Sequence, residues 1–207
     1  MIFGSFNTSW AVPAPPAAND GQTIFLHQSF EPGSFLFTLE ATLQWGPSAA
    51  GGGAFWAVAS WYIHSIHDGP TFFTPAFQVN QGQRLDASIS LFNSVPSSPF
   101  NYICQFKNLP GTMFQLVNTE EFRWAEVGLE WANVIVTHPT DPFNGVTKRE
   151  DYPTGSTVFT PTTIQFTNGE FPAQFWGSSG NEGDRKKIAV ENDIQGNVNT
   201  VTINYGP

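Results

Sequence analysis

Residues 34–45 alternate well between apolar and polar side chains, and this pattern limits the possible fold more than any other feature of the chain. The apolar set is Phe35, Phe37, Leu39, Ala41, Leu43 and Trp45, and the polar set is Thr38, Glu40, Thr42 and Gln44. Successive side chains of a β-strand point to opposite faces of its sheet. The segment is therefore predicted to be a strand with one buried face.

Glycine and proline interrupt the chain too often for long helices, since it has 19 Gly and 16 Pro in 207 residues. Aromatic residues reach 15%, whereas charged residues are only 12%. Further strand candidates follow at short spacing, at residues 23–28, 54–64, 78–79, 84–92, 102–107, 113–117, 126–137, 163–167 and 198–205. We therefore predict an all-β antiparallel sandwich of roughly ten to fourteen strands, in a single domain over residues 1–207.

The chain is acidic, with 8 basic and 17 acidic residues, a net charge of −9 and a pI near 4.7. Nucleic acids and anionic membrane surfaces attract clustered Lys and Arg, so neither is expected as a partner. The acidity favours polypeptides or neutral glycans. No stretch approaches the ~18 apolar residues of a membrane span, so no membrane insertion is expected.

The opening residues 1–7 lack the basic and apolar regions of a signal peptide. We therefore expect a cytoplasmic protein, or a secreted one whose leader has been removed.

Neither the cysteine nor a pair of nearby histidines indicates a chemical site. Cys104 lies in a strand-like run and is expected to be a small buried core residue, not a nucleophile. His64 and His67 are three positions apart near a strand end, whereas ligands on one strand face are two apart. No Cys or carboxylate cluster accompanies them, so we expect no metal and no cofactor.

Two polar residues occur where a strand pattern would place a site. Gln44 ends the alternating strand, just before the small-residue loop 46–53. Glu130 lies inside the otherwise apolar run 127–136. A carboxylate in such a run is expected to be partly desolvated, which helps it to hold or accept a proton in mildly acidic solution.

The neighbours of Glu130 on its strand favour a binding groove. Gly128 and Ala132 share its face and leave space above the sheet. Glu126 has the same parity and is the reserve candidate. From spacing alone, these residues are equally compatible with a rim carboxylate that has no catalytic role.

Several short motifs, in order, resemble the glutamic peptidases, or eqolisins. Leu43-Gln44-Trp45-Gly46 resembles the family's Leu-Gln-Thr-Gly segment, and Trp61-Tyr62 resembles the end of its next strand. Gln78–Gln83, Leu129-Glu130-Trp131 and Thr200–Tyr205 then follow in the family's order. The resemblance covers most of the chain from about Trp10.

The resemblance implies a bent, concanavalin-like jelly roll of two antiparallel sheets of roughly seven strands, with the active site on a concave face. It also implies that Glu130 is the general base for peptide hydrolysis, with Glu126 in reserve, and that Gln44 orients the water and stabilises the oxyanion. The chain departs from the family where supporting acids stand beside the dyad. The aligned positions here are Trp56, Val58 and Ser60, and the family's Trp-Val-Gly-Ile-Asp-Gly-Asp segment becomes Phe25-Leu26-His27-Gln28.

Two other functions fit the same fold. A non-catalytic, lectin-like protein would stack neutral sugars on aromatic side chains of the concave face. Its candidate binding residues are Trp45, Trp56, Trp61 and Trp131. Glycoside hydrolysis by Glu126 and Glu130 ranks third, because residues four apart on one strand lie roughly 13 Å apart at their Cα atoms.

Overall fold

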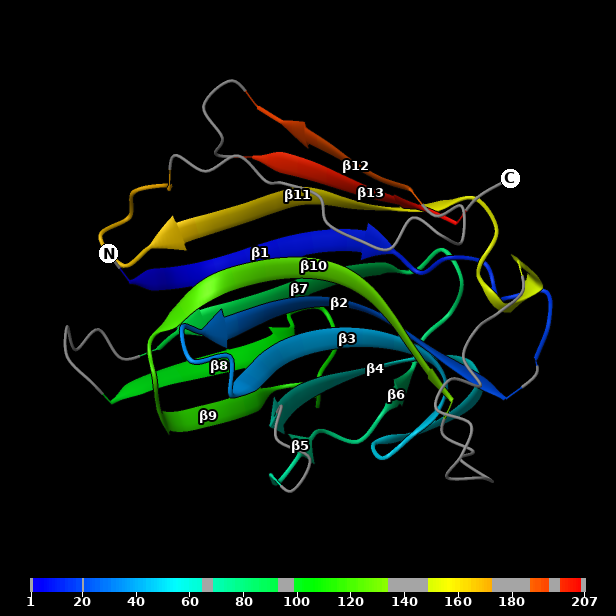
Figure 1. The fold of residues 1–207 in the computed structure, drawn as a ribbon, viewed down its shortest axis with the longest axis horizontal. Coiled ribbons are helices and arrows are strands. Elements are labelled where there is room, and N and C mark those ends of the chain that lie inside the picture. The colour runs from blue at the N-terminus through cyan, green and yellow to red at the C-terminus, as the bar shows by residue number, and fades with distance from the viewer. Residues whose placement is uncertain are drawn as a thin grey trace.

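The computed structural model describes residues 2–19, 21–64, 69–92, 99–133, 149–172, 187–193 and 198–205, without the side chains of residues 118, 131–133 and 149. These residues form thirteen strands and one short 3₁₀ turn, Arg149–Asp151. The strands make two antiparallel sheets that lie one over the other (Figure 1). The all-β sandwich prediction is therefore confirmed.

The larger sheet has seven strands and the smaller has six. In spatial order, the seven-stranded sheet contains β12 (Lys187–Asn192), β13 (Asn199–Asn204), β11 (Ser156–Phe166), β1 (Phe3–Ala11), β7 (Arg84–Leu91), β8 (Phe100–Phe106) and β9 (Phe114–Thr119). The six-stranded sheet contains β10 (Phe122–Asn133), β2 (Gln22–Pro32), β3 (Phe37–Ser48), β4 (Gly51–His64) and β5 (Phe72–Phe73), and β6 (Phe77–Gln78) also pairs with β4.

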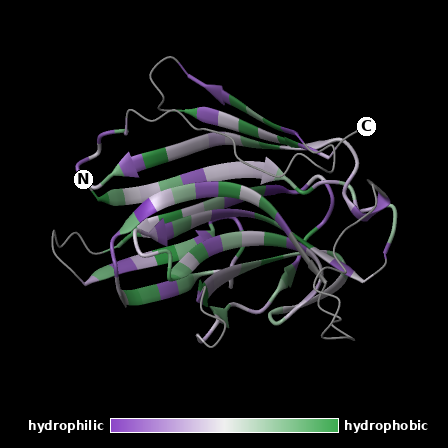
Figure 2. Ribbon diagram, in the orientation of Figure 1, coloured by the Kyte–Doolittle hydropathy of each residue, from purple (hydrophilic) through white to green (hydrophobic). Residues whose placement is uncertain are grey.

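One hydrophobic core fills the space between the sheets. Hydropathy alternates along the strands in Figure 2, as expected when every second side chain points inward. Phe30 of β2 illustrates the packing, because its ring lies 5.2 Å from Phe3 and 5.4 Å from Phe6 of the opposite sheet. Leu39 and Leu43 of β3 are fully buried in the same core, so the buried face predicted for this strand is confirmed.

The predicted strand at 34–45 starts three residues later than expected, because its first residues form the β2–β3 turn. The backbone N–H of Phe35 donates to the carbonyl of Pro32 at 3.1 Å. Phe35 has a φ of 54° and is half exposed, with its ring 5.5 Å from that of Trp124. Phe35 therefore lies outside the core face that the alternation assigned to it.

Strand β1 lies at the centre of the seven-stranded sheet, and the sequence pattern did not predict it. Its pairing with β11 shifts register between Phe3 and Ser5. A β-bulge adds one residue to a strand, so the inward residues after it are no longer two apart from those before it. Phe3 and Phe6 are consequently both buried, although they are three positions apart.

Candidate active site on the outer face of the six-stranded sheet

We call the face of the six-stranded sheet that points away from the core the outer face. It consists of the residues of β10, β2, β3 and β4 whose parity is opposite to that of the core residues. They are Trp124, Glu126, Gly128, Glu130, Thr23, Phe25, His27, Ser29, Glu31, Thr38, Glu40, Thr42, Gln44, Ala57, Ala59, Trp61 and Ile63. The four strands run side by side in Figure 1, so segments far apart in sequence contribute to one surface.

Gln44 and Glu130 lie on this face in one cross-strand row. Glu130 of β10 pairs with Phe25 of β2, and Phe25 pairs with Gln44 of β3. The row continues to Ala57 of β4. Two strand spacings separate the Cα atoms of Gln44 and Glu130, about 10 Å. Strand β2, with Phe25, therefore stands between the two candidate residues.

The side-chain amide of Gln44 is fully engaged within the β3–β4 hairpin. Its Nε2 donates to the carbonyl oxygens of Gly51 at 2.8 Å and Gly46 at 3.2 Å, and its Oε1 accepts from Ser48 Oγ at 2.9 Å. The residue is fully buried. Gly52 approaches so closely that a Cβ there would collide with this amide. In this conformation Gln44 holds the hairpin together and has no free amide hydrogen.

Glu130 and Glu126 are both exposed. The expectation that Glu130 is desolvated by its apolar neighbours is therefore wrong, because those neighbours at odd positions, such as Val127, point into the core. Gly128 lies between the two carboxylates on the same face, as the parity predicted. An exposed carboxylate at this place is accessible to a ligand.

The desolvated carboxylate of the outer face is Glu40. It is buried, and burial raises the pKa of its carboxyl group, an effect that His27 partly opposes and that Glu130 adds to. Its Oε1 accepts a hydrogen bond from Thr42 Oγ1 at 2.8 Å. Its Oε2 lies 3.7 Å from Nδ1 of His27, which is also buried. A buried carboxylate beside an imidazole is an arrangement able to store and pass a proton.

His27 has no hydrogen-bond partner at either ring nitrogen. Its Nε2 lies directly over Gly128, where a Cβ would collide with the ring. Oε1 of Glu126 is 3.0 Å from the same Cβ position. His27 thus lies between the buried Glu40 and the exposed Glu126, in a space that exists because residue 128 is glycine.

A fourth carboxylate, Glu31, extends the acidic group along β2. Partial burial raises its pKa, and the negative charge of Glu126 raises it further, while a hydrogen bond from Thr38 at 3.4 Å lowers it. Glu31, Glu40, Glu126 and Glu130 therefore influence one another across three adjacent strands.

The tryptophans proposed as a sugar-stacking surface do not lie together. Trp45 and Trp56 point into the core, where their rings are 5.6 Å apart. Trp61 belongs to the outer face but is buried, with its ring 4.9 Å from Phe73. The side chain of Trp131 lies outside the described residues. At least two of the four aromatic faces are thus unavailable to a sugar.

The residues at the positions aligned with the family's supporting acids point into the core and away from the outer face. Trp56 and Val58 belong to the core, and Ser60 donates to the carbonyl oxygen of Thr112 at 2.7 Å, on the core side of β4. Ala57 is the β4 residue in register with Gln44. Sequence reasoning therefore missed Glu40 and His27. The available signal was that Glu40 shares the polar face of residues 34–45 with Gln44, and that His27 lies on the strand before it.

Cys104 is fully buried, and desolvation raises the pKa of its thiol to about 12, which confirms the prediction of a core residue. His64 packs its ring 5.3 Å from that of Tyr62, and His67 lies outside the described residues. Within the described ranges, no three His, Cys, Asp or Glu side chains are grouped as a metal site requires. The part of the chain that the structure describes contains no helix with the length and apolar character needed to cross a membrane.

Comparisons with family models and with curated proteins found no match. Solved structures do match. Scytalido-glutamic peptidase, in complexes with a peptide-based transition-state analogue and with a transition-state analogue inhibitor, aligns over 97% of this chain and 91% of its own, with TM-scores of 0.55 and 0.56 and 12% identity.

A second eqolisin-family peptidase, SCP-B in complex with the tripeptide Ala-Ile-His, aligns over the same shares of both chains, with a TM-score of 0.53 and 14% identity. At such identities the likeness establishes a shared fold, because one fold supports many activities. The resemblance suggested by the short motifs is therefore supported at the level of the fold.

Proposed function

We propose that this protein is a glutamic-type acid peptidase-like protein that binds a polypeptide on the outer face of the six-stranded sheet. The observation that carries the proposal is the register that joins Glu130, Phe25 and Gln44 in one row of that face. The fold that this chain shares with the eqolisin structures supports the proposal.

In the proposed reaction, the exposed Glu130 carboxylate takes a proton from a water molecule. The water oxygen attacks the carbonyl carbon of the peptide bond, and Gln44 donates an amide N–H to the oxyanion that forms. The C–N bond then breaks, and the proton moves from Glu130 to the leaving nitrogen. Because both amide hydrogens of Gln44 are in use, it must exchange one bond, and the 3.2 Å bond to Gly46 is the longer.

The engaged amide of Gln44 favours a second candidate, which is peptide binding without cleavage. If the β3–β4 hairpin keeps its hydrogen bonds when a peptide binds, the oxyanion receives no donor from Gln44. A single preorganised donor typically contributes about 2.7–4 kcal/mol to such a transition state. The outer face would then bind a polypeptide and leave it intact.

The test is digestion of denatured casein between pH 2 and 6 by the wild-type protein and by Glu130→Gln, Gln44→Ala and Glu126→Gln. We expect Glu130→Gln to lower the rate about 10²–10⁴-fold and Gln44→Ala to lower it about 10²–10³-fold. Glu191→Gln removes the same charge from an exposed position of β12 in the other sheet, so it should keep the wild-type rate.

If wild-type protein leaves casein intact across this range, the peptidase proposal is rejected. Retention of casein peptides without cleavage would then support the second candidate. Capture of glycans on an array, with no peptide bound, would support the carbohydrate-binding alternative. If the cleavage rate falls in Glu126→Gln and not in Glu130→Gln, the general base is Glu126 and not Glu130.

A further inference from the structure

The outer face carries a group of ionisable side chains that the proposed reaction does not use. Buried His27 contacts buried Glu40 through Nδ1 at 3.7 Å, while its unpartnered Nε2 borders the space above Gly128. Oε1 of the exposed Glu126 borders the same space. A buried nitrogen without a hydrogen-bond partner is rare in folded proteins and calls for an explanation.

The charge of this face is one-sided. The ionisable side chains on its rows are Glu31, Glu40, Glu126, Glu130 and His27. The rows contain no Lys or Arg among the described side chains. Their charges act on one another, since Glu126 and Glu130 both raise the pKa of Glu31 and of Glu40. A positively charged ligand group would relieve this repulsion.

We propose that Glu126, positioned by the buried His27–Glu40 pair, binds a lysine or arginine side chain of a peptide on the outer face. In its protonated form His27 has two N–H donors, one for Glu40 and one for Glu126. Glu40 lies 3.7 Å from Nδ1 on one side of the ring, and on the other side the protonated Nε2 would attract the Glu126 carboxylate, which borders the same space above Gly128. The inference rests on the proposed function only in taking a polypeptide as the ligand, and it assigns binding to Glu126 and proton transfer to Glu130.

The glycine at position 128 is part of the arrangement. Any side chain at that position would occupy the space that the imidazole of His27 and the Glu126 carboxylate both border. A Gly128→Ala variant therefore displaces His27 without removing a charge. This variant therefore tests whether the position of Glu126 matters for binding while the net charge of the outer face stays the same.

The experiment measures the affinity of two peptides that differ at one position, lysine in one and norleucine in the other. Binding is measured at pH 5 and low salt on Glu130→Gln, so that cleavage does not interfere. We expect the lysine peptide to bind roughly fivefold more tightly, the upper range for an exposed ion pair. The preference should fall towards one in Glu126→Gln and with 1 M salt, and it should persist in Glu191→Gln.

His27 is tested by a pair of uncharged substitutions. His27→Gln keeps an amide N–H that reaches towards Glu126, whereas His27→Ala keeps none. We expect the lysine preference to survive in His27→Gln and to be lost in His27→Ala and Gly128→Ala. Circular dichroism of each variant checks that the fold is retained.

A second measurement does not depend on ligand binding. The ring signals of His27 in NMR spectra, identified by their loss in His27→Gln, should shift in the pH range where carboxyl groups titrate. In Glu126→Gln, the part of that shift due to Glu126 should disappear.

The inference is overturned if lysine and norleucine peptides bind equally, or if Glu126→Gln keeps the preference. It is also overturned if His27→Gln and His27→Ala behave alike, or if the His27 signals do not respond to Glu126. Because binding and NMR are both independent of cleavage, a protein that digests no casein can still pass these tests.

Discussion

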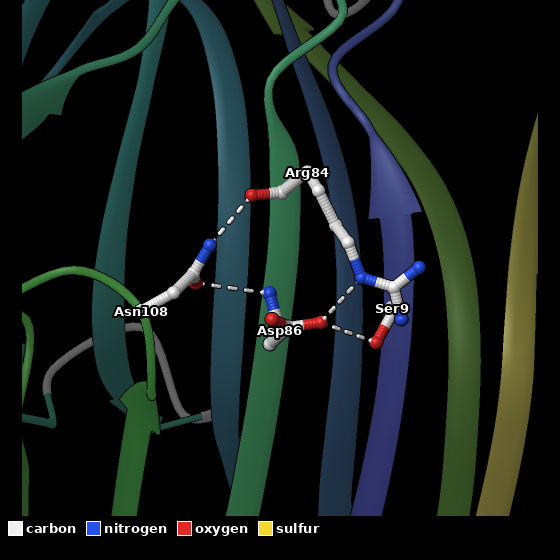
Figure 3. Close-up of polar contacts among 4 residues, drawn as sticks. All are labelled: Ser9, Arg84, Asp86 and Asn108. Atoms are coloured by element: carbon white, nitrogen blue, oxygen red, sulfur yellow. Dashed lines mark hydrogen bonds and ion pairs between the residues drawn. The ribbon is translucent and has the colours of Figure 1, made fainter.

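Charged groups have different surroundings on the outer face of the six-stranded sheet and on the side of the seven-stranded sheet that also points away from the core. On the seven-stranded sheet, Asp86 of β7 accepts hydrogen bonds from Ser9 Oγ at 2.6 Å and Arg84 Nε at 2.9 Å, as Figure 3 shows. Asn108 completes the group by accepting from the Asp86 backbone N–H and donating to the Arg84 carbonyl. On the six-stranded sheet, Glu40 is buried with one hydroxyl donor and an imidazole whose nitrogens lack hydrogen bonds.

The pKa values of the two carboxyl groups shift in opposite directions for this reason. Desolvation alone would raise the pKa of Asp86, but its bonds from Ser9 and Arg84 outweigh that and lower it. Desolvation dominates at Glu40 and raises its pKa. Satisfied charges on one face stabilise the fold, whereas unsatisfied ones on the other are typical of a site that awaits a ligand. The contrast favours a structural role for the first face and agrees with the peptide-binding role proposed for the second.

Among the substitutions that test this contrast, Gly128→Ala is expected to have the largest effect on stability. Its Cβ meets the buried imidazole of His27, so the ring must move within packed surroundings. We expect a loss of about 1–3 kcal/mol in the free energy of unfolding, measured by urea denaturation. Gly33→Ala is the matched control, because its Cβ meets only the exposed side chain of Arg123 at 3.3 Å. Equal losses in both variants would show that His27 is not tightly held.

Glu40→Gln should change how stability depends on pH. A carboxyl group whose pKa is raised by folding stabilises the folded state fully below its ordinary pKa, and this contribution is lost as the pH rises through the raised value. Wild-type Tm should therefore fall between pH 4.5 and neutral pH, and the fall should be smaller in Glu40→Gln. Thermal unfolding over this range measures it, and an unchanged slope would contradict the burial of an ionisable Glu40.

Asp86→Asn should change the pH dependence of stability in the direction opposite to Glu40→Gln, and its effect should be the smallest of the three substitutions. A lowered pKa gives stability that is present above the ordinary carboxyl range and is lost as the pH falls through the lowered value. The Asp86 side chain is 35% exposed, so the loss at neutral pH should stay below about 1 kcal/mol. Urea denaturation at pH 7 and at pH 3 should show a larger difference between variant and wild type at pH 7 than at pH 3. A larger loss at pH 3 would remove the contrast between the two faces.

The strand and its buried face could be predicted in β3, where apolar and polar residues alternate. In β4 both parities are largely apolar, so the strand was predicted but the structure buries Trp56 and Val58 in the core and places Ala57, Ala59 and Trp61 on the outer face. The prediction failed at β1, where the bulge at Phe3 and Ser5 breaks the period, and at Phe35, where a positive φ places an apolar residue in a turn. The shared face of Gln44 and Glu130 rested on motifs and is present in the register. The engagement of the Gln44 amide could not be predicted, because its hydrogen bonds to the carbonyl oxygens of Gly46 and Gly51 and from Ser48 Oγ depend on the geometry of the hairpin.

The sequence by itself determined that this chain forms antiparallel strands around an aromatic core, because alternation and the lack of long helical segments leave few other ways to bury its apolar side chains. It also determined the parity that places Glu40, Thr42 and Gln44 on one face. Only the tertiary structure decided which carboxylate is buried away from solvent. Solvent access depends on how β10, β2 and β3 lie against one another, and a linear pattern carries no information about that distance. The register of β2 with β3 makes Glu40 a diagonal neighbour of His27, and the register of β2 with β10 places Gly128, about a hundred residues later in the chain, opposite His27.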